Sequence, residues 1–230
     1  MHLHARLALV TVVGGIILAG FQGLDARGQA PGAASGPSGP AATAPDPTKP
    51  QKLEMAAGTQ ARYRVREQLA GISFPSDAVG STTSVTGAIV VNPDGSLDSG
   101  RSTIRVDLRT IASDQQMRDG YVQRNTLETD KYPFLEFVPK RAVGLPVPFP
   151  SAPPAQAGFQ LIGDMTLHGV TSEATWNVVA TFAPGAVSGR ATTTVLFSTY
   201  KIAKPSLARL LSVDDKIELE IEFKTTRTGA

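Results

Sequence analysis

The sequence predicts a mainly β domain of about eight antiparallel strands with one or two short helices, preceded by a leader and a linker. Three observations support this prediction. Apolar and polar residues alternate with a period of two over most of the chain after residue 58, as in strands that bury one face. Turn-forming residues separate the alternating segments, at Asn92-Pro93-Asp94-Gly95, Ala183-Pro184-Gly185 and Val213-Asp214-Asp215. Only two short stretches have helical spacing instead.

The first thirty residues (1–30) have the profile of a signal peptide. A weakly basic start precedes an apolar run from Leu7 to Gly20, and no charged side chain occurs between Leu7 and Leu24. A membrane-spanning helix is the alternative, but the run is short for the roughly 20 apolar residues that cross a bilayer. We therefore expect a periplasmic or secreted protein, and an uncleaved leader would instead serve as an N-terminal membrane anchor.

Residues 31–57 are expected to form a linker. From Pro31 to Pro50 the chain consists mainly of Pro, Gly, Ala and Ser, without Val, Ile, Leu or an aromatic residue. Such a segment cannot bury enough apolar surface to offset the entropy lost on ordering. The predicted domain then covers 58–226, which is long enough for one sizeable core and too short for two.

The last predicted strand, KIELEIEFK, has the clearest alternation. Ile217, Leu219 and Ile221 share one face, and glutamates take the other. The first predicted strand, QARYRVRE, presents arginines on its outer face. Eight such one-sided strands must bury their apolar faces together, either as a sandwich or as a closed barrel. Closure would place the arginines beside the glutamates, and two separately solvated faces are the alternative.

Three segments interrupt the alternation. Asp114 to Arg124 has helical spacing, with Ser113 or Asp114 as its N-cap, and Pro205 to Leu211 is the second helical stretch. Leu145 to Pro154 contains five prolines and is expected to be a long hairpin loop.

Composition argues against several functions. The chain has no cysteine, so disulfides, thiolate zinc sites and cysteine nucleophiles are excluded. The net charge is +2 with dispersed basic residues, which does not indicate a nucleic-acid partner. His168 is the only histidine after the leader, whereas metal sites need several ligands. The G-x-S-x-G motif of a serine nucleophile is absent from the sequence. Carboxylates are plentiful, but none lies in a sequence context that indicates a glycoside hydrolase. We expect no catalytic residue, no metal and no enzyme.

His168 is better interpreted as a turn residue. The pair His168-Gly169 lies between two strongly alternating segments, and Gly169 can adopt a positive φ. We therefore expect a turn between two strands, from which His168 could still contact the polar end of a ligand.

Three segments, in order, resemble the YceI-like family of exported polyisoprenoid-binding proteins: MRDGYVQRNTLETDKYPFLEF, GDMTLHGVTSEATW and SVDDKIELEIEF. The markers that carry the resemblance are Leu127, Lys131-Tyr132-Pro133, Phe137, Gly163 and Leu167-His168-Gly169-Val170-Thr171. Two positions depart from the family pattern. Tyr121 stands where the family often has a histidine, and Ser198 to Lys201 replaces an Arg-x-Asp-Phe-Gly pattern.

The resemblance implies an eight-stranded, lipocalin-like barrel that holds an amphiphile with an isoprenoid tail. A barrel of this size either fills with its own side chains or encloses one ligand. Each buried methylene contributes roughly 0.8 kcal/mol, so a tail of several isoprene units would bind strongly. We expect a non-enzymatic carrier or sequestering protein for an isoprenoid lipid or quinone. The alternative is a filled barrel that serves as an interaction module near the membrane, without a small-molecule ligand.

The expected site consists of inward-facing side chains from most strands. No cofactor is expected apart from a bound polyisoprenoid or quinone, and the sequence does not predict an oligomeric state. His168 and Tyr121 are the candidates for contact with the head group of the ligand. The candidates for the barrel interior are Tyr63, Val65, Ile89, Ile104, Val106, Leu108, Leu135, Phe137, Phe159, Met165, Leu167, Trp176, Val178, Val195, Phe197 and Leu219.

Overall fold

Antiparallel strands make up most of the chain that the computed structural model describes, which is residues 45–150, 155–206 and 208–230. The expected signal peptide and residues 31–44 of the expected linker lie outside these ranges. The strands are β1 (Gln51–Met55), β2 (Gln60–Leu69), β3 (Ser76–Thr82), β4 (Val85–Val91), β5 (Thr103–Asp107), β6 (Phe134–Val143), β7 (Ala155–Leu167), β8 (Val170–Ala183), β9 (Ala186–Leu196) and β10 (Leu210–Gly229).

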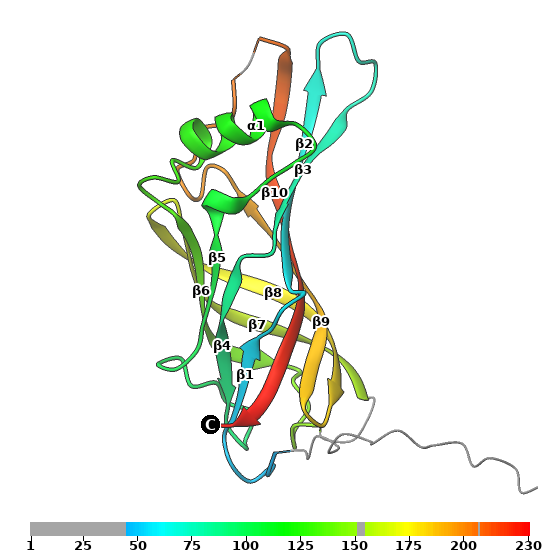
Figure 1. Ribbon diagram of the computed structural model, residues 1–230, viewed down its shortest axis with the longest axis vertical. Helices are drawn as coiled ribbons and strands as arrows, with labels where there is room; N and C mark the ends of the chain where they lie inside the picture. The colour runs from blue at the N-terminus through cyan, green and yellow to red at the C-terminus, as the bar shows by residue number, and fades with distance from the viewer. Residues whose placement is uncertain (1–44, 151–154, 207) are drawn as a thin grey trace, which may run out of the picture. The chain divides into compact units, whose positions relative to one another are not determined.

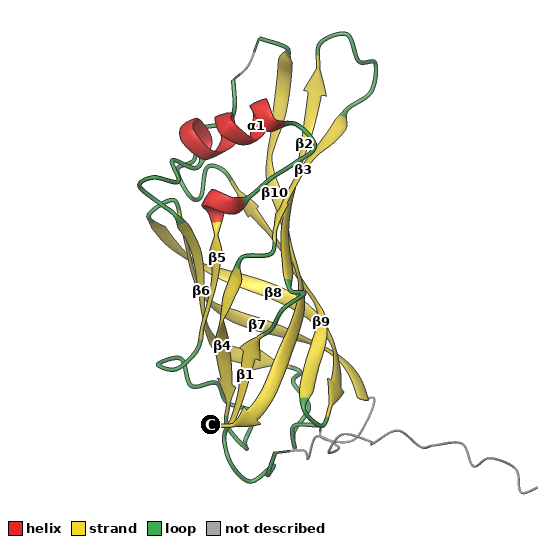
Figure 2. Cartoon of the chain, viewed as in Figure 1, coloured by secondary structure: helices red, strands yellow, loops and turns green. Residues whose placement is uncertain are grey.

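The strands close into a barrel (Figures 1 and 2). Their order is β1-β4-β5-β6-β7-β8-β9-β10-β2-β3, and β1 also pairs with β10. β1 and β2 lie end to end along β10, while β3 and β4 continue one another along β2 and β1. The ten strands therefore occupy eight positions of a closed antiparallel barrel. This confirms the predicted barrel and excludes the sandwich.

The outward-facing arginines of β2 lie beside the outward-facing glutamates of β10, as expected for a closed barrel. In the register of β2 and β10, Arg62 lies opposite Glu220 and Arg64 opposite Glu218. Arg62 Nη1 lies 3.1 Å from both Glu220 Oε1 and Glu222 Oε1. Exposed pairs of this kind contribute only about 0.2–1 kcal/mol each, so they fix the register of the strands more than the stability of the fold.

The ordered barrel begins earlier in the chain than the sequence indicated. β1 lies inside residues 31–57, which were assigned to the linker, and β10 extends past residue 226. Leu53 is buried, and it alternates with the outward-facing Lys52 and Glu54 while β1 pairs with both β4 and β10. The strand has only five residues, which is too few for its alternation to stand out beside a proline-rich segment.

The helical predictions are only partly correct. α1 (Gln116–Tyr121) begins after Gln115, so neither Ser113 nor Asp114 is its N-cap. The carboxylate of Asp119 instead accepts hydrogen bonds from the Ser113 backbone N–H and hydroxyl. A π-helical turn, η2 (Val122–Thr126), continues α1, and a 3-10 turn, η1 (Leu108–Thr110), follows β5.

The second expected helix, at 205–211, is wrong for the residues described there. Leu210 and Leu211 begin β10, and Leu210 pairs with Leu69 of β2. The expected turn at Val213 also lies within β10, where a register shift takes up the irregularity. No helix in the described ranges has the length and apolar character needed to cross a membrane.

In the orientation of Figure 1 the upper end of the barrel carries α1, and the lower end carries β1 and the C-terminus. The proline-rich segment that was predicted to be a hairpin loop lies between β6 and β7, and the structure describes this loop from Gly144 to Pro150. Its Phe149 is buried against the lower end of the barrel, with its ring edge-on to that of Phe182. The barrel thus has a lower end covered by a loop and an upper end covered by α1 and η2.

Candidate functional site

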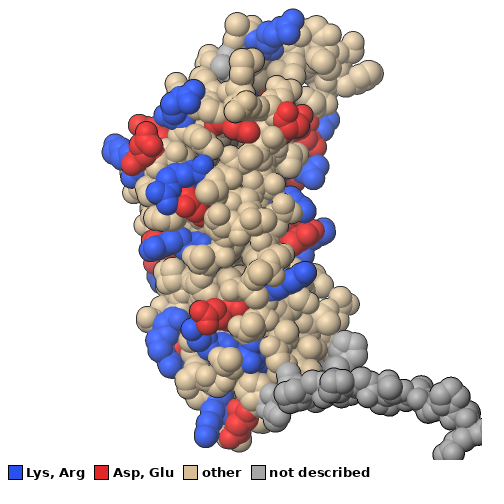
Figure 3. Space-filling model, in the orientation of Figure 1, with Lys and Arg blue, Asp and Glu red and all other residues tan. Residues whose placement is uncertain are grey.

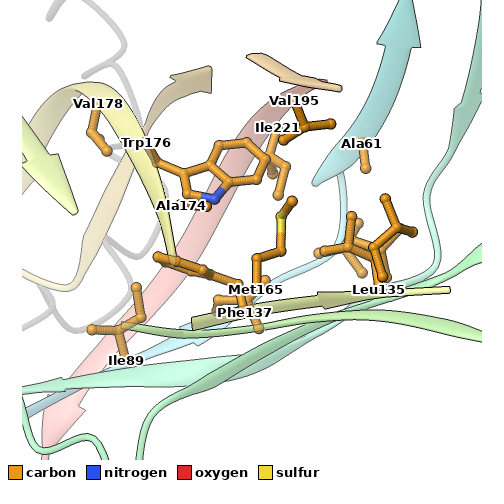
Figure 4. Close-up of a cluster of buried hydrophobic side chains, with 14 of the residues drawn as sticks. Ala61, Ile89, Leu135, Phe137, Met165, Ala174, Trp176, Val178, Val195 and Ile221 are labelled. Atoms are coloured by element: carbon orange, nitrogen blue, oxygen red, sulfur yellow. The ribbon is translucent and has the colours of Figure 1, made fainter. Parts of the chain in front are cut away.

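The interior of the barrel is apolar, and the strand period placed its residues correctly. Every predicted interior candidate belongs to the buried core or packs against it. Tyr63, Phe159 and Leu219 are the partly buried members, and the others are fully buried. Alternation along each strand explains the placement of those within strands, because a residue and its second neighbour face the same side of a sheet, while Leu108 and Phe197 directly follow β5 and β9. Figure 4 shows part of this cluster around Trp176 and Met165.

Three cavities lie along the barrel axis inside this core. The lower cavity gives the centre of a water molecule about 80 Å³ of space, the middle cavity about 40 Å³ and the upper cavity about 110 Å³. One water needs only about 10–15 Å³ on this measure. Protein cores contain few voids larger than a water molecule, so this barrel is not solidly filled by its own side chains.

The lower cavity is lined almost entirely by aliphatic and aromatic side chains. Its walls include Phe137, Phe159 and Trp176, with Thr225 as a polar exception. An apolar surface of this kind offers a water molecule almost no hydrogen-bond partners, so it favours an apolar guest over water. Burial of an apolar chain there would release its hydration water and stabilise the complex.

The three cavities share lining residues. Leu135 lines all three of them, and Trp176 lines both the lower and the middle cavity. Met165 is fully buried beside them and points toward Trp176 (Figure 4).

Most predicted candidates line these cavities. Met165 and Val195 are the exceptions, and both are buried within the same core. Leu53, Met55, Leu145 and Phe149 line the lower cavity but were not among the candidates. Leu53 and Met55 were missed because the alternation in the five-residue β1 is too short to stand out, and the loop residues Leu145 and Phe149 follow no period.

Three buried polar atoms in the cavity walls have no hydrogen-bond partner among the residues that the structure describes: Tyr63 Oη, Thr126 Oγ1 and Trp176 Nε1. Tyr63 and Thr126 both line the upper cavity. Burial raises the pKa of Tyr63 to about 12, so its hydroxyl is a neutral donor at physiological pH. Each atom could pair with a polar group of a guest, since an unsatisfied buried donor lowers stability.

His168 lies in the turn that the sequence predicted. Leu167 and Val170 pair across the β7–β8 hairpin, and His168 and Gly169 between them have φ of 51° and 72°. Positive φ at both central positions is typical of a type I′ turn. His168 Nε2 lies 2.7 Å from Glu128 Oε2, and its ring centroid lies 4.6 Å from that of Tyr132. The family marker residues thus connect this turn to the segment after η2.

The two head-group candidates differ in position. Tyr121 lines the upper cavity, and its hydroxyl accepts a hydrogen bond from the Ser206 N–H at 3.3 Å. The imidazole of His168 is engaged by Glu128 and Tyr132, whereas its neighbour Leu167 reaches the upper cavity. Within the described ranges, no group of three or more His, Cys, Asp or Glu side chains could hold a metal ion.

A wider groove lies in the barrel wall, across β8, β9, β10 and β2. It gives water centres about 790 Å³ of space, and its walls include the charged Arg62 and Glu173 as well as the buried Val195 and Tyr200. Pairing between β8 and β9 stops at Asn177 and Thr192, which leaves the strand edges above them unpaired with each other. The groove is polar and open, so it does not offer the desolvated surface that an apolar chain prefers. The interior cavities are the better candidate site.

Fold and interior together define a closed antiparallel barrel with an apolar, partly hollow core. The chain belongs to the YceI-like family, because the YceI-like domain model matches residues 55–225. No curated protein matches the chain.

Solved structures resemble this barrel at low sequence identity. A polyisoprenoid binding domain from Saccharophagus degradans has 10% identity and a TM-score of 0.58, over 76% of this chain and 97% of that chain. Burkholderia cenocepacia BcnA has 12% identity and a TM-score of 0.52, over 73% and 96%. A Campylobacter jejuni YceI protein has 15% identity and a TM-score of 0.53, over 69% and 90%. At these identities the likeness concerns the fold.

Proposed function

We propose that this protein binds an isoprenoid lipid or an isoprenoid quinone inside its barrel, as a carrier or a sequestering protein without catalytic activity. The observation that carries the proposal is the row of three apolar cavities along the barrel axis. Membership of the YceI-like family and the polyisoprenoid binding domain of Saccharophagus degradans support it. A filled barrel without a ligand would leave these cavities without a role.

The chemistry of the interior favours a long, thin and flexible guest. Each five-carbon isoprene unit that leaves water for an apolar site would contribute about 4 kcal/mol, before the entropy of ordering the chain is subtracted. A branched polyprenyl tail can bend past Leu135 and Trp176, which partition the interior. The head group would then lie in the upper cavity, within reach of Tyr63, Thr126 and Tyr121.

We further propose that the protein acts outside the cytoplasm, as the apolar leader predicts. Its location would follow from cell fractionation, and N-terminal sequencing of the mature protein would locate any cleavage. An intact leader on a membrane-bound protein would favour the anchored alternative.

Trp176 makes the proposal directly testable. It is the only tryptophan in the chain, and it lies between the lower and the middle cavity. A long-chain isoprenoid benzoquinone delivered from detergent micelles should quench its fluorescence with saturation at one equivalent. Organic extraction of the purified protein followed by mass spectrometry should also recover a prenyl compound.

A benzoquinone without the isoprenoid tail is the matched control, and it should quench only weakly and without saturation. Equal quenching by the two compounds would show that the tail is not recognised. A clean extract together with no quenching by the long-chain quinone would refute the proposed function.

A further inference from the structure

The upper end of the molecule has two adjacent projections with exposed apolar side chains. One is the turn Ala70–Pro75 between β2 and β3, where Phe74 is 79% and Ile72 is 52% exposed. The other is the start of β10, where Leu211 is 67% exposed. The Ala70 N–H donates to the Arg209 carbonyl oxygen at 2.8 Å, so the projections are held side by side. Figure 1 shows both extending beyond α1.

We infer that these two projections, the upper tips, dock on the surface of a lipid bilayer. The inference extends the proposed function, since a protein that takes up membrane lipids must meet a membrane. Large apolar side chains at the ends of turns are poorly placed for a protein partner, because two narrow convex tips bury little surface against each other. A bilayer instead adapts to the tips and admits Phe74 and Ile72 between its head groups.

Charge at the upper tips favours the same partner. Residues 68–76 carry no charged side chain, and residues 203–212 carry Lys204 and Arg209 but no carboxylate. Arg209 is exposed and forms no ion pair with any residue in the described ranges. Basic side chains near an anionic membrane surface are attracted to it. On the face drawn in Figure 3, the outermost end carries basic and no acidic atoms.

The upper cavity lies directly behind the upper tips. Leu210, the neighbour of Leu211, faces this cavity together with Val213 and Pro205. Leu211 is 67% exposed, so it faces outward where Leu210 faces the interior. A bilayer in contact with Leu211 and Phe74 would therefore lie at the end of the barrel through which a lipid has the shortest path to the interior.

The test places a dye at one tip residue of the full-length chain. The chain has no cysteine, so Phe74→Cys accepts a single environment-sensitive nitrobenzoxadiazole label. Val179→Cys is the matched control, because Val179 is also exposed, at 53%, but lies on the barrel wall. The vesicles contain phosphatidylcholine alone or phosphatidylcholine with one-third phosphatidylglycerol, with or without spin-labelled acyl chains. Both variants keep the same leader, so its own affinity for the vesicles affects them equally.

Docking predicts that the label at Phe74→Cys shifts to the blue and is quenched by the spin-labelled acyl chains, while the label at Val179→Cys does neither. The unlabelled double variant Ile72→Ser, Phe74→Ser should partition to the vesicles about tenfold less than the wild type. Val179→Ser should stay within about twofold. Arg209→Gln should weaken binding about fivefold, and only to the vesicles with phosphatidylglycerol.

The inference is overturned if the emission of the label at Phe74→Cys neither shifts nor is quenched when vesicles are added. It is also overturned if that label shifts to the blue without vesicles as protein concentration rises, since a second copy then covers the tips. Quinone uptake from detergent micelles separates this question from the proposed function. The double variant should take up quinone as the wild type does, and reduced micellar uptake would place Ile72 and Phe74 in ligand binding rather than docking. If the wild type takes up none, the binding proposal fails and the label alone decides docking.

Discussion

Phe149 meets Phe182 edge to face, with ring centroids 5.1 Å apart and ring planes at 89°. Phe149 comes from the loop after β6, and Phe182 comes from the barrel wall on β8, so the pair joins the loop to the wall of the lower cavity. The guanidinium of Arg227 also lies over the Phe149 ring, 4.6 Å from its centroid, and donates to the Pro150 carbonyl oxygen. The loop is thus held over the lower end of the barrel by both apolar and polar contacts.

Replacement of Phe149 with alanine should therefore weaken both the fold and ligand retention. The free energy of unfolding should fall by about 3 kcal/mol or more, as for other buried phenylalanines. Bound quinone should also leave faster, because the cover of the lower cavity is gone. Urea denaturation and the recovery of Trp176 fluorescence after dilution measure these effects. Val147→Ala, in the same loop but exposed, should change stability by less than about 0.5 kcal/mol. Equal behaviour of the two variants would mean that the loop does not act as a cover.

Leu135 is the residue at which all three cavities meet. Leu135→Phe should fill part of this junction, and because the added atoms have space, the free energy of unfolding should change by less than about 1.5 kcal/mol. Affinity for a long-chain quinone, measured by Trp176 quenching, should fall at least about tenfold, which corresponds to about 1.4 kcal/mol. Val179→Phe adds an aromatic ring on the outer wall and should leave the affinity unchanged. Unchanged affinity in Leu135→Phe would show that the ligand does not pass this junction.

The raised pKa of Tyr63 predicts how stability depends on pH in the alkaline range. The phenol ionises near pH 10 in the unfolded chain but only near pH 12 in the folded protein, because burial disfavours the phenolate. The contribution of Tyr63 to stability is therefore fully present below pH 10 and is lost as the pH rises toward 12. In Tyr63→Phe the free energy of unfolding should decline less steeply above pH 10, as measured by urea denaturation at several pH values. An identical decline in the wild type and the variant would contradict the burial of this hydroxyl.

Period-two alternation was sufficient to predict which side chains face the interior. Val65 was placed correctly because it lies in the ten-residue β2, with Arg64 and Arg66 as its neighbours. The family resemblance then selected a barrel rather than a sandwich, which the alternation alone could not do, because both architectures bury one face of each strand.

The features that the sequence did not predict depend on tertiary contacts. Phe149 is buried only because the loop folds back onto Phe182, and no local pattern encodes that contact. Val213 resembled a turn because two aspartates follow it, yet pairing with β2 keeps it in β10. The cavities were also not predictable, since their volumes depend on how side chains such as Leu135 pack together.

Gly169, the family marker in the β7–β8 turn, has both a positive φ and a neighbouring side chain that leaves no room for a Cβ. Gly71 has only the positive φ, so a comparison of the two glycines separates the effects. Gly169 has φ of 72°, and a Cβ there would lie 2.5 Å from Tyr132 Cε1. Gly71 has φ of 82°, but a Cβ there would meet nothing within 4 Å. Backbone strain alone should make Gly71→Ala less stable by about 1 kcal/mol. Gly169→Ala should be less stable by about 2–4 kcal/mol, because it must also displace the Tyr132 ring that packs on His168.

Thermal and urea denaturation of the two glycine variants measure this difference. The near-ultraviolet circular dichroism of the tyrosines should change in Gly169→Ala and stay constant in Gly71→Ala, because only the first crowds an aromatic ring. If both substitutions lower stability equally, the left-handed backbone alone accounts for the glycine, and the contact with Tyr132 adds nothing. A larger loss at Gly169 would instead mean that the turn and the segment around Tyr132 stabilise each other, which would give His168 a structural role in holding the two together.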